Sequence, residues 1–128
     1  MIVGIGVDVV DAARFARTLE RTPALAGRLF APGELVRHPQ GGPLPVRSLA
    51  VRFAAKEALV KAFGGAGGMG WHDMRVLQDD AGKPAFALSG GAAELAENLG
   101  VTGLHLSMSH DGDVAIAYVV AEGESHGR

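Results

Sequence analysis

Three groups of polar residues stand at positions where their side chains could do chemistry. Asp8 follows the apolar run of residues 2–7, Glu57 and Lys61 lie one helical turn apart, and residues 109–111 read Ser-His-Asp. The chain contains no cysteine, so thiolate-held zinc and thiol chemistry are excluded. A metal must therefore be held by carboxylates, histidines or ligand phosphates, which favours a hard ion such as Mg²⁺.

Each group also has an ordinary structural interpretation. An aspartate after a strand is most often a turn former or a helix cap. A glutamate and a lysine four residues apart usually form a surface ion pair, which contributes about 0.2–0.5 kcal/mol. Adjacent strand residues point to opposite faces, so Ser109, His110 and Asp111 cannot form a catalytic triad among themselves. By the same alternation His110 shares a face with Leu106 and Met108, so a core histidine is an alternative interpretation. Taken singly, no group is specific.

The helix that must carry Glu57 and Lys61 is predicted to start at Ser48 or just before it and to include residues 52–64. Alanine, leucine, lysine and glutamate favour a helix there, and Gly64-Gly65 supplies its C-terminal stop. Its charged residues form two narrow stripes, and an alanine and leucine face covers most of the remaining circumference. This pattern predicts a helix that is buried on several sides. A charge in such a place needs a partner or a ligand.

The other elements are predicted from period and turn residues. The strand before Asp8 contains Gly4 and Gly6, which indicates close approach by other backbone, and Asp11 is expected to cap a helix. The elements predicted in chain order are a helix at 12–20, a helical turn from 22, a short helix from 31, strands at 71–77 and 84–88, a helix at 89–99, and strands at 104–110 and 114–120. This order predicts an α+β fold with a small antiparallel sheet packed on the long central helix. We expect a single domain over residues 1–121 and a disordered tail at 122–128.

The glycine-rich stretch at residues 65–70 fits the GxGxxG expression of dinucleotide-binding proteins. That motif follows a strand and opens a helix, whereas here it follows a helix and precedes a strand. We therefore interpret the stretch as a flexible loop beside the end of the central helix.

The charge distribution limits the choice of partners. Residues 1–61 carry nine Lys/Arg and five Asp/Glu, net +4, and residues 62–128 carry three and nine, net −6, which together give the −2 of the chain. A positive half without interleaved aromatic residues suits an anionic cofactor or an acidic protein better than nucleic acid. No apolar run is long enough to span a bilayer, and the first residues lack the pattern of a signal peptide, so we expect a cytoplasmic protein.

Taken together and in this order, the motifs resemble those of the short holo-acyl-carrier-protein synthases, which are 4′-phosphopantetheinyl transferases. The resemblance covers about residues 2–121. The matching segments are the opening at 4–10, the signature helix at 52–62, and later landmarks at 71–73, 82–84 and 107–111. Each segment alone is a weak signal, but their combination is highly specific. The resemblance implies the 4′-phosphopantetheinyl transferase fold.

The resemblance also implies a reaction. Such enzymes transfer the 4′-phosphopantetheine arm of coenzyme A to a serine of an acyl carrier protein and release adenosine 3′,5′-bisphosphate. In the family, the acids at the positions of Asp8 and Glu57 hold Mg²⁺ against the diphosphate. The lysine at the position of Lys61 lies close to the phosphates, and the histidine at that of His110 lines the nucleotide site. Asp11 departs from the pattern, in which glutamate is more common, so a role for this position is open.

The resemblance further implies a homotrimer with active sites between subunits, whose basic first helix docks the acidic carrier protein. For these carrier contacts we choose the arginines Arg14, Arg21 and Arg28. A solvated helix face is the alternative interpretation of each of them.

The chemistry of the residues agrees with this reaction, because phosphoryl transfer chiefly needs positioning and neutralisation of charge. Lys61 can stabilise or protonate the leaving phosphate. Glu57, acting through a metal-bound water, is the first candidate for the general base, and His110 and Asp111 are weaker ones. The residues predicted to bind coenzyme A are Arg47, Arg52, Lys61, Gly64, Gly65, Ser109 and His110. Among these, Arg47 and Arg52 are candidates for the 3′-phosphate, and the two glycines let backbone approach the ligand.

Two other functions stay open at this point. One is a magnesium-dependent phosphohydrolase that uses the same carboxylates with water as the nucleophile. The other is a non-catalytic module that binds acidic partners through its arginine-rich first helix.

Overall fold

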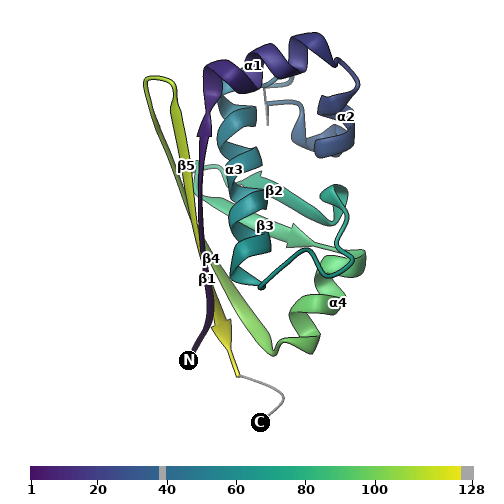
Figure 1. Ribbon diagram of the computed structural model, residues 1–128, viewed down its shortest axis with the longest axis vertical. Coiled ribbons are helices and arrows are strands. Elements are labelled where there is room, and N and C mark those ends of the chain that lie inside the picture. Colours follow the sequence, from purple (N-terminus) through teal and green to yellow (C-terminus); the bar gives the residue numbers. More distant parts are fainter. Residues whose placement is uncertain (38–39, 125–128) are drawn as a thin grey trace.

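A long helix, α3 (Val46–Ala62), forms the centre of the molecule. The computed structural model describes residues 1–37 and 40–124, and in it α3 lies between two antiparallel sheets (Figure 1). One sheet has three strands in the order β1-β5-β4, which are β1 (Ile2–Asp11), β5 (Val114–Gly123) and β4 (Val101–Asp111). The other is the hairpin of β2 (Met74–Gln78) and β3 (Pro84–Leu88).

The remaining helices cover the two ends of α3. Helices α1 (Ala12–Arg21) and α2 (Leu25–Leu29) lie near its first turns, and α4 (Gly90–Asn98) lies near its last (Figure 1). Two short 3₁₀ helices, η1 (Pro32–Glu34) and η2 (Trp71–Asp73), lie in the connections. This arrangement confirms the predicted α+β class and the packing of the long helix on a small antiparallel sheet. Within the described residues, none of the helices combines the length and the apolar character needed to cross a membrane.

Glycines on β1 allow the strand to approach α3 closely. A Cβ atom at Gly4 would overlap the carbonyl oxygen of Ala62, and a Cβ atom at Gly6 would overlap that of Ala58. The close backbone approach expected from these two glycines is therefore confirmed. Because alternate residues of a strand share a face, the next inward-facing position is Asp8, which is thereby set against α3.

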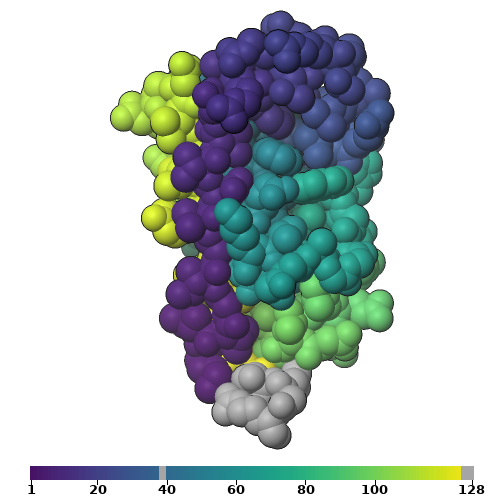
Figure 2. Space-filling model, in the orientation of Figure 1, coloured from purple at the N-terminus to yellow at the C-terminus, as the bar shows by residue number. Residues whose placement is uncertain are grey.

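The opposite face of the three-stranded sheet is open. Its large apolar side chains include Ile5, Val7, Val9 and Tyr118, which are 38–60% exposed. Val7 and Tyr118 lie directly opposite each other in the pairing of β1 with β5. In the space-filling view β1 is exposed along the molecule (Figure 2). Exposed apolar side chains gathered on one face of a sheet are typical of protein interaction surfaces.

A buried ion pair ties α3 to its surroundings. Nζ of Lys56 lies 2.8 Å from Oε1 of Glu34, and both side chains are fully buried. Nζ also donates to the carbonyl oxygens of Leu29 and Trp71, and Oε2 of Glu34 accepts from the backbone N–H of Val76. Burial lowers the pKa of Lys56, and the hydrogen bond to Glu34 opposes this shift. The pair thus joins α2, η1, η2 and β2 to one point on α3.

Two helix ends have the caps that the sequence predicts. Oδ1 of Asp11 accepts from the backbone N–H of Arg14 at 3.0 Å, which confirms Asp11 as the N-cap of α1. At the end of α3, Gly64 adopts a φ of 81°, and the N–H of Gly65 donates to the carbonyl of Val60 at 2.9 Å. This is the Schellman arrangement, which a residue with a side chain would strain at the position of Gly64.

Residues around η2 depart from the prediction. The strand expected from residue 71 begins only at Met74, because residues 71–73 form a 3₁₀ turn. Ser89 stands at the N-cap of α4, but its side chain makes no capping bond. Instead, Oδ2 of Asp73 accepts from the N–H groups of Gly70 and Gly91 and so caps α4 from a distant position in the sequence.

Strands β1 and β5 of the three-stranded sheet are longer than predicted. β1 continues through Asp8 to Asp11, because β5 supplies a paired partner along this whole stretch. β5 runs to Gly123, with Glu122 paired to Ile2, so the predicted tail at 122–128 is wrong for its first two residues. The rest of that predicted tail, residues 125–128, lies outside the described residues.

Candidate active site

Lys61 joins β1 to α3 at the first of two polar clusters. Its Nζ lies 3.1 Å from Oδ1 of Asp8 and 3.0 Å from the carbonyl oxygen of Val7. The described ion pair of Lys61 is therefore with Asp8 across two elements, and not with Glu57 along the helix as the spacing suggests. The lysine side chain is 55% exposed, whereas that of Asp8 is only 17% exposed. Lys61 thus holds a partly buried carboxylate and still reaches solvent.

Glu57 lies half-buried beside this ion pair. Burial raises its pKa above the ordinary value, the negative charge of Asp8 raises it further, and the positive charge of Lys61 opposes both effects. The ionised form of Glu57 is therefore less favourable here than it would be in water. Two carboxylates that repel each other in a partly desolvated place are stabilised by a cation between them.

The pair Asp8 and Glu57 fits a Mg²⁺ ion in its donor chemistry. Magnesium keeps several waters and is usually bound by one or two carboxylates together with substrate phosphates. Across the residues described, no cluster of three or more His, Asp or Glu side chains offers a complete protein cage. Two carboxylates beside an exposed lysine suit an ion whose other ligands are phosphate oxygens and water.

An aromatic cavity of about 610 Å³ opens next to these carboxylates. Asp8, Glu57 and Arg14 contribute polar groups to its wall. The apolar part includes Phe53, whose ring centroid lies 5.3 Å from that of Phe15 and 5.6 Å from that of Trp71. The sequence does not predict this wall as a site feature, because its rings come from three separate elements. The available signal was Phe53, which precedes Glu57 by one helical turn.

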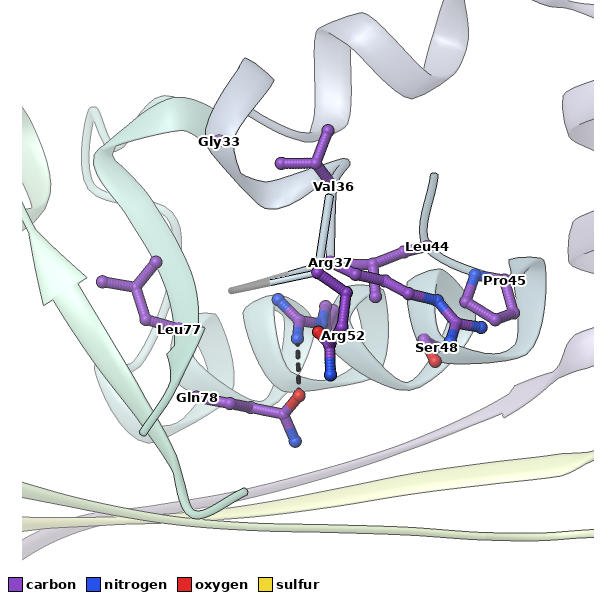
Figure 3. A pocket seen from close by; sticks show the side chains of 10 residues that line it. Gly33, Val36, Arg37, Leu44, Pro45, Ser48, Arg52, Leu77 and Gln78 are labelled. Atoms are coloured by element: carbon purple, nitrogen blue, oxygen red, sulfur yellow. Dashed lines mark hydrogen bonds between the residues drawn. The ribbon is translucent and has the colours of Figure 1, made fainter. Parts of the chain in front are cut away.

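The second polar cluster gathers residues from α3, β2 and β4. Arg52, Ser109 and His110 line a common cavity of about 180 Å³, together with Ser48 and Gln78. Three of the seven residues predicted to bind coenzyme A are therefore brought together, although 57 positions separate Arg52 from Ser109 in the sequence. A larger cavity of about 450 Å³ shares Ser48, Arg52 and Gln78 with it (Figure 3).

Arg52 is nearly buried between these cavities, with 6% of its surface exposed. Its guanidinium donates to the carbonyl oxygen of Val76 at 2.9 Å and to Oε1 of Gln78 at 2.8 Å. Burial lowers its pKa, and the charge of Glu34 opposes this effect. Arg52 therefore has a structural role that the sequence did not reveal, namely to fix β2 against α3.

The other predicted site residues lie apart from these cavities or at their margins. Gly64 and Lys61 line a cavity of about 380 Å³ at the end of α3. Arg47 is exposed in the first turn of α3 and lines none of the cavities described above. Arg21 and Arg28 are exposed on α1 and α2.

The two clusters line different cavities within one chain. The cavity of Asp8 and Glu57 contains neither Arg52 nor His110, and the cavity of Arg52 and His110 contains neither acid. Each cluster by itself offers half of what a diphosphate-containing ligand needs, namely a metal site or a basic site.

Comparison with known proteins decides the family. The family model described as the 4′-phosphopantetheinyl transferase superfamily matches residues 4–119. A protein of Clavibacter michiganensis named holo-[acyl-carrier-protein] synthase is 58% identical over 125 residues, which are 98% of this chain and 99% of that protein. The chain belongs to the 4′-phosphopantetheinyl transferase superfamily. Its match to holo-[acyl-carrier-protein] synthases over nearly the full length makes it a transferase of that type.

Solved structures of holo-[acyl-carrier-protein] synthases share the fold. The crystal structure from Neisseria meningitidis is 41% identical, with a TM-score of 0.85, and covers 95% of this chain and 99% of its own. The structure of the ACPS–CoA complex from Chronobacterium ammoniagenes is 35% identical, with a TM-score of 0.81 and coverage of 94% and 97%. The resemblance drawn from the sequence motifs is thus confirmed for the family, the fold and the type of enzyme.

Proposed function

We propose that the protein transfers the 4′-phosphopantetheine moiety of coenzyme A to a serine of an apo-acyl carrier protein. In this proposal the reaction depends on Mg²⁺, releases adenosine 3′,5′-bisphosphate and takes place in the cytoplasm. The observation that carries it is the cluster of Asp8, Glu57 and Lys61, two carboxylates and an exposed lysine next to an aromatic cavity. The coenzyme A complex of the related protein supports the choice of donor.

The residues around the diphosphate have separate tasks in this reaction. The serine oxygen attacks the phosphorus on the pantetheine side of the diphosphate, and the bond from that phosphorus to the bridging oxygen breaks. Lys61 neutralises or protonates the leaving phosphate, because its ammonium is exposed at this point. Glu57 is the first candidate to accept the serine proton. Bound Mg²⁺ would be held by Asp8 and Glu57 and would neutralise the charge of the diphosphate oxygens.

We assign the nucleotide end of coenzyme A to the second cluster. Arg52 and His110 line one cavity with Ser109, and a guanidinium and a hydroxyl are suitable donors to phosphate and ribose oxygens. Because the two clusters line different cavities, we propose that one subunit supplies Asp8 and Glu57 and its neighbour supplies Arg52, Ser109 and His110. A homotrimer that pairs these halves in a cyclic manner has three complete sites.

The outer face of the three-stranded sheet is the surface that we assign to this assembly. It exposes apolar side chains such as Val7, Val9 and Tyr118, whose burial between subunits is favourable. The apolar content of this face supports an assembly of identical chains, since obligate homo-oligomeric interfaces are more hydrophobic than ordinary surface.

The acidic carrier protein is assigned to the arginines of the first two helices. Arg14 lines the aromatic cavity with Asp8 and Glu57, so a carrier bound there would place its serine near the carboxylates. Arg21 lies two turns further along α1, and Arg28 follows on α2. Exposed arginines at this end chiefly steer an acidic partner into place.

The proposal is tested by incubating the protein with coenzyme A, Mg²⁺ and apo-acyl carrier protein and weighing the carrier by intact mass spectrometry. We expect the carrier to gain about 340 Da, the mass of the transferred arm. Release of phosphate without a gain in carrier mass would indicate a phosphohydrolase. Formation of a stable complex without turnover would indicate a binding module, and either result would contradict the proposal.

A further inference from the structure

Lys61 lies in the last turn of α3 and binds one of the two carboxylates assigned to the metal. Its Nζ lies 3.1 Å from Oδ1 of Asp8 and 3.0 Å from the carbonyl oxygen of Val7 on β1. An ammonium has three N–H donors. Two of those of Lys61 therefore have acceptors among the described residues. Asp8 thus already has a cation beside it in the free protein.

Glu57 receives much less of this positive charge. The ion pairs found among residues 1–37 and 40–124 leave Glu57 without a cationic partner within 4.0 Å. Burial and the charge of Asp8 raise the pKa of Glu57, and the charge of Lys61 opposes these effects only in part. One lysine therefore serves two acids and is bound to only one of them.

The other lysine of α3 that forms an ion pair shows by contrast that Lys61 is free to move. Lys56 is fully buried, and its Nζ donates to Glu34 and to two backbone carbonyl oxygens. The side chain of Lys61 is instead 55% exposed. An exposed ion pair adds little to stability, and the four-carbon stem of a lysine is flexible. Lys61 can therefore leave Asp8 without disturbing the core.

We infer that Lys61 competes with the metal ion for Asp8 and leaves Asp8 for the diphosphate of coenzyme A. The protein then binds the metal together with coenzyme A and not before it. This role of Lys61 rests on the proposed function. An ammonium and a divalent cation on one carboxylate repel each other, so metal binding is weak while Lys61 stays there. The diphosphate offers Lys61 another anion and supplies oxygen ligands for the metal. Lys61 thereby couples the two binding steps.

The coupling is tested by titrating the wild type and Lys61→Met with Mn²⁺, a paramagnetic substitute for Mg²⁺, and following free Mn²⁺ by electron paramagnetic resonance. Without coenzyme A, we expect Mn²⁺ to bind Lys61→Met about tenfold more tightly than the wild type, because the competing charge is gone. With saturating coenzyme A, the two proteins should bind Mn²⁺ with similar affinity. The factor by which coenzyme A tightens Mn²⁺ binding should therefore be about tenfold smaller in the variant.

Lys83→Met is the matched control. Lys83 is exposed in the turn between β2 and β3, so its loss changes the net charge of the protein by the same amount. This control should bind Mn²⁺ as the wild type does. Lys61→Gln, a second neutral variant, repeats the measurement if Lys61→Met does not fold. Thermal melting gives an independent readout, in which Mg²⁺ alone should raise the melting temperature of Lys61→Met at a lower concentration than that of the wild type.

Three results would overturn the inference. An unchanged or weaker Mn²⁺ affinity of free Lys61→Met would show that Lys61 does not compete for Asp8. An equal gain in Lys83→Met would reduce the effect to net charge. A wild type that binds Mn²⁺ equally well with and without coenzyme A would remove the coupling.

Failure of the proposed function looks different from failure of the coupling. A wild type that shows the coupling but adds no mass to the carrier would contradict the transfer reaction alone. A fully active wild type whose Lys61→Met variant binds Mn²⁺ no more tightly would contradict only the competition between Lys61 and the metal.

Discussion

At the scale of single residues, the chemistry concentrates on Glu57. It lies on the central helix with a pKa raised first by burial and then by the charge of Asp8. A carboxylate placed in this way costs stability in the free protein, which is typical of a group kept for binding or catalysis. Lys61 relieves this cost only in part, because its charge lowers the pKa of Glu57 while its described ion pair is with Asp8.

Substitution of Glu57 by Gln should separate activity from stability. The change removes the charge and keeps the shape, so we expect transfer to fall by about a hundredfold or more. Because ionisation of Glu57 is less favourable in the folded protein than in water, the melting temperature without Mg²⁺ should stay the same or rise slightly. The control is Glu94→Gln, which neutralises an exposed carboxylate on α4 and should retain full activity. Near-normal turnover of Glu57→Gln at saturating Mg²⁺ would refute the metal assignment.

Asp11 permits a prediction about pH. The hydrogen bond from the N–H of Arg14 lowers the pKa of this carboxyl below its ordinary value of 3.8. A depressed carboxyl pKa stabilises the folded state above the unfolded pKa, and this contribution disappears as the pH falls through the folded value. Wild type should therefore be more stable than Asp11→Asn at neutral pH, and the difference should vanish in strong acid. Urea unfolding of both proteins across pH measures it, and a difference that is constant with pH would contradict the charge effect.

At the scale of elements, the packing around α3 depends on small residues on one side of the helix and on buried polar groups on the other. Gly4 and Gly6 bring β1 against it, and Lys56 with Glu34 joins it to the opposite layer. The first contact could be predicted from strand glycines. The second could not, because nothing in the local sequence of Glu34 indicates a partner 22 positions later.

The candidate site likewise has one part that could be predicted from the sequence and another that could not. The resemblance of the motifs predicted Asp8, Glu57 and Lys61 as one cluster, and the structure places them together. From the period of α3 we expected Glu57 and Lys61 to be the charged residues in a buried position. In the structure the fully buried charged side chain of this helix is that of Lys56. The role of Arg52 at β2 depends on contacts between distant segments, which neither period nor spacing encodes.

The packing of β1 on α3 is tested by two glycine substitutions. A side chain at Gly6 would overlap the backbone oxygen of Ala58, so Gly6→Ala should destabilise the protein by about 1–3 kcal/mol or more. Gly27→Ala is the matched control, because no atom lies within 4 Å of a Cβ added there. That change, in helix α2, should be neutral or stabilising by up to about 1 kcal/mol. Equal melting temperatures of the two variants would contradict the close approach.

At the scale of the whole molecule, the proposed assembly rests on the open apolar face and on the two separate polar clusters. The face explains how identical chains would associate, and the clusters explain why association would be needed for activity. Neither feature follows from composition, since a net charge of −2 and 48% hydrophobic residues are ordinary for a globular chain.

Substitution of Tyr118 by Glu should dissociate the assembly. Tyr118 is 51% exposed on the outer face of the sheet, opposite Val7. Light scattering of the wild type should give about three times the chain mass of 13.2 kDa. The variant should give the mass of one chain and lose transfer activity, whereas Ala93→Glu on the exposed side of α4 should remain trimeric. A monomeric and fully active wild type would refute the assembly.

The most direct test of a site shared between subunits uses two inactive variants in one mixture. Glu57→Gln lacks the metal half and His110→Ala lacks the nucleotide half, so each alone should leave the carrier mass unchanged with coenzyme A and Mg²⁺. When the two chains are refolded together, random mixing in a cyclic assembly should make about a quarter of the sites complete. We expect the mixture to transfer the arm at about that fraction of the wild-type rate, as measured by the gain in carrier mass. No gain in carrier mass from the mixture, with mixed assemblies shown to form, would contradict a site shared between subunits.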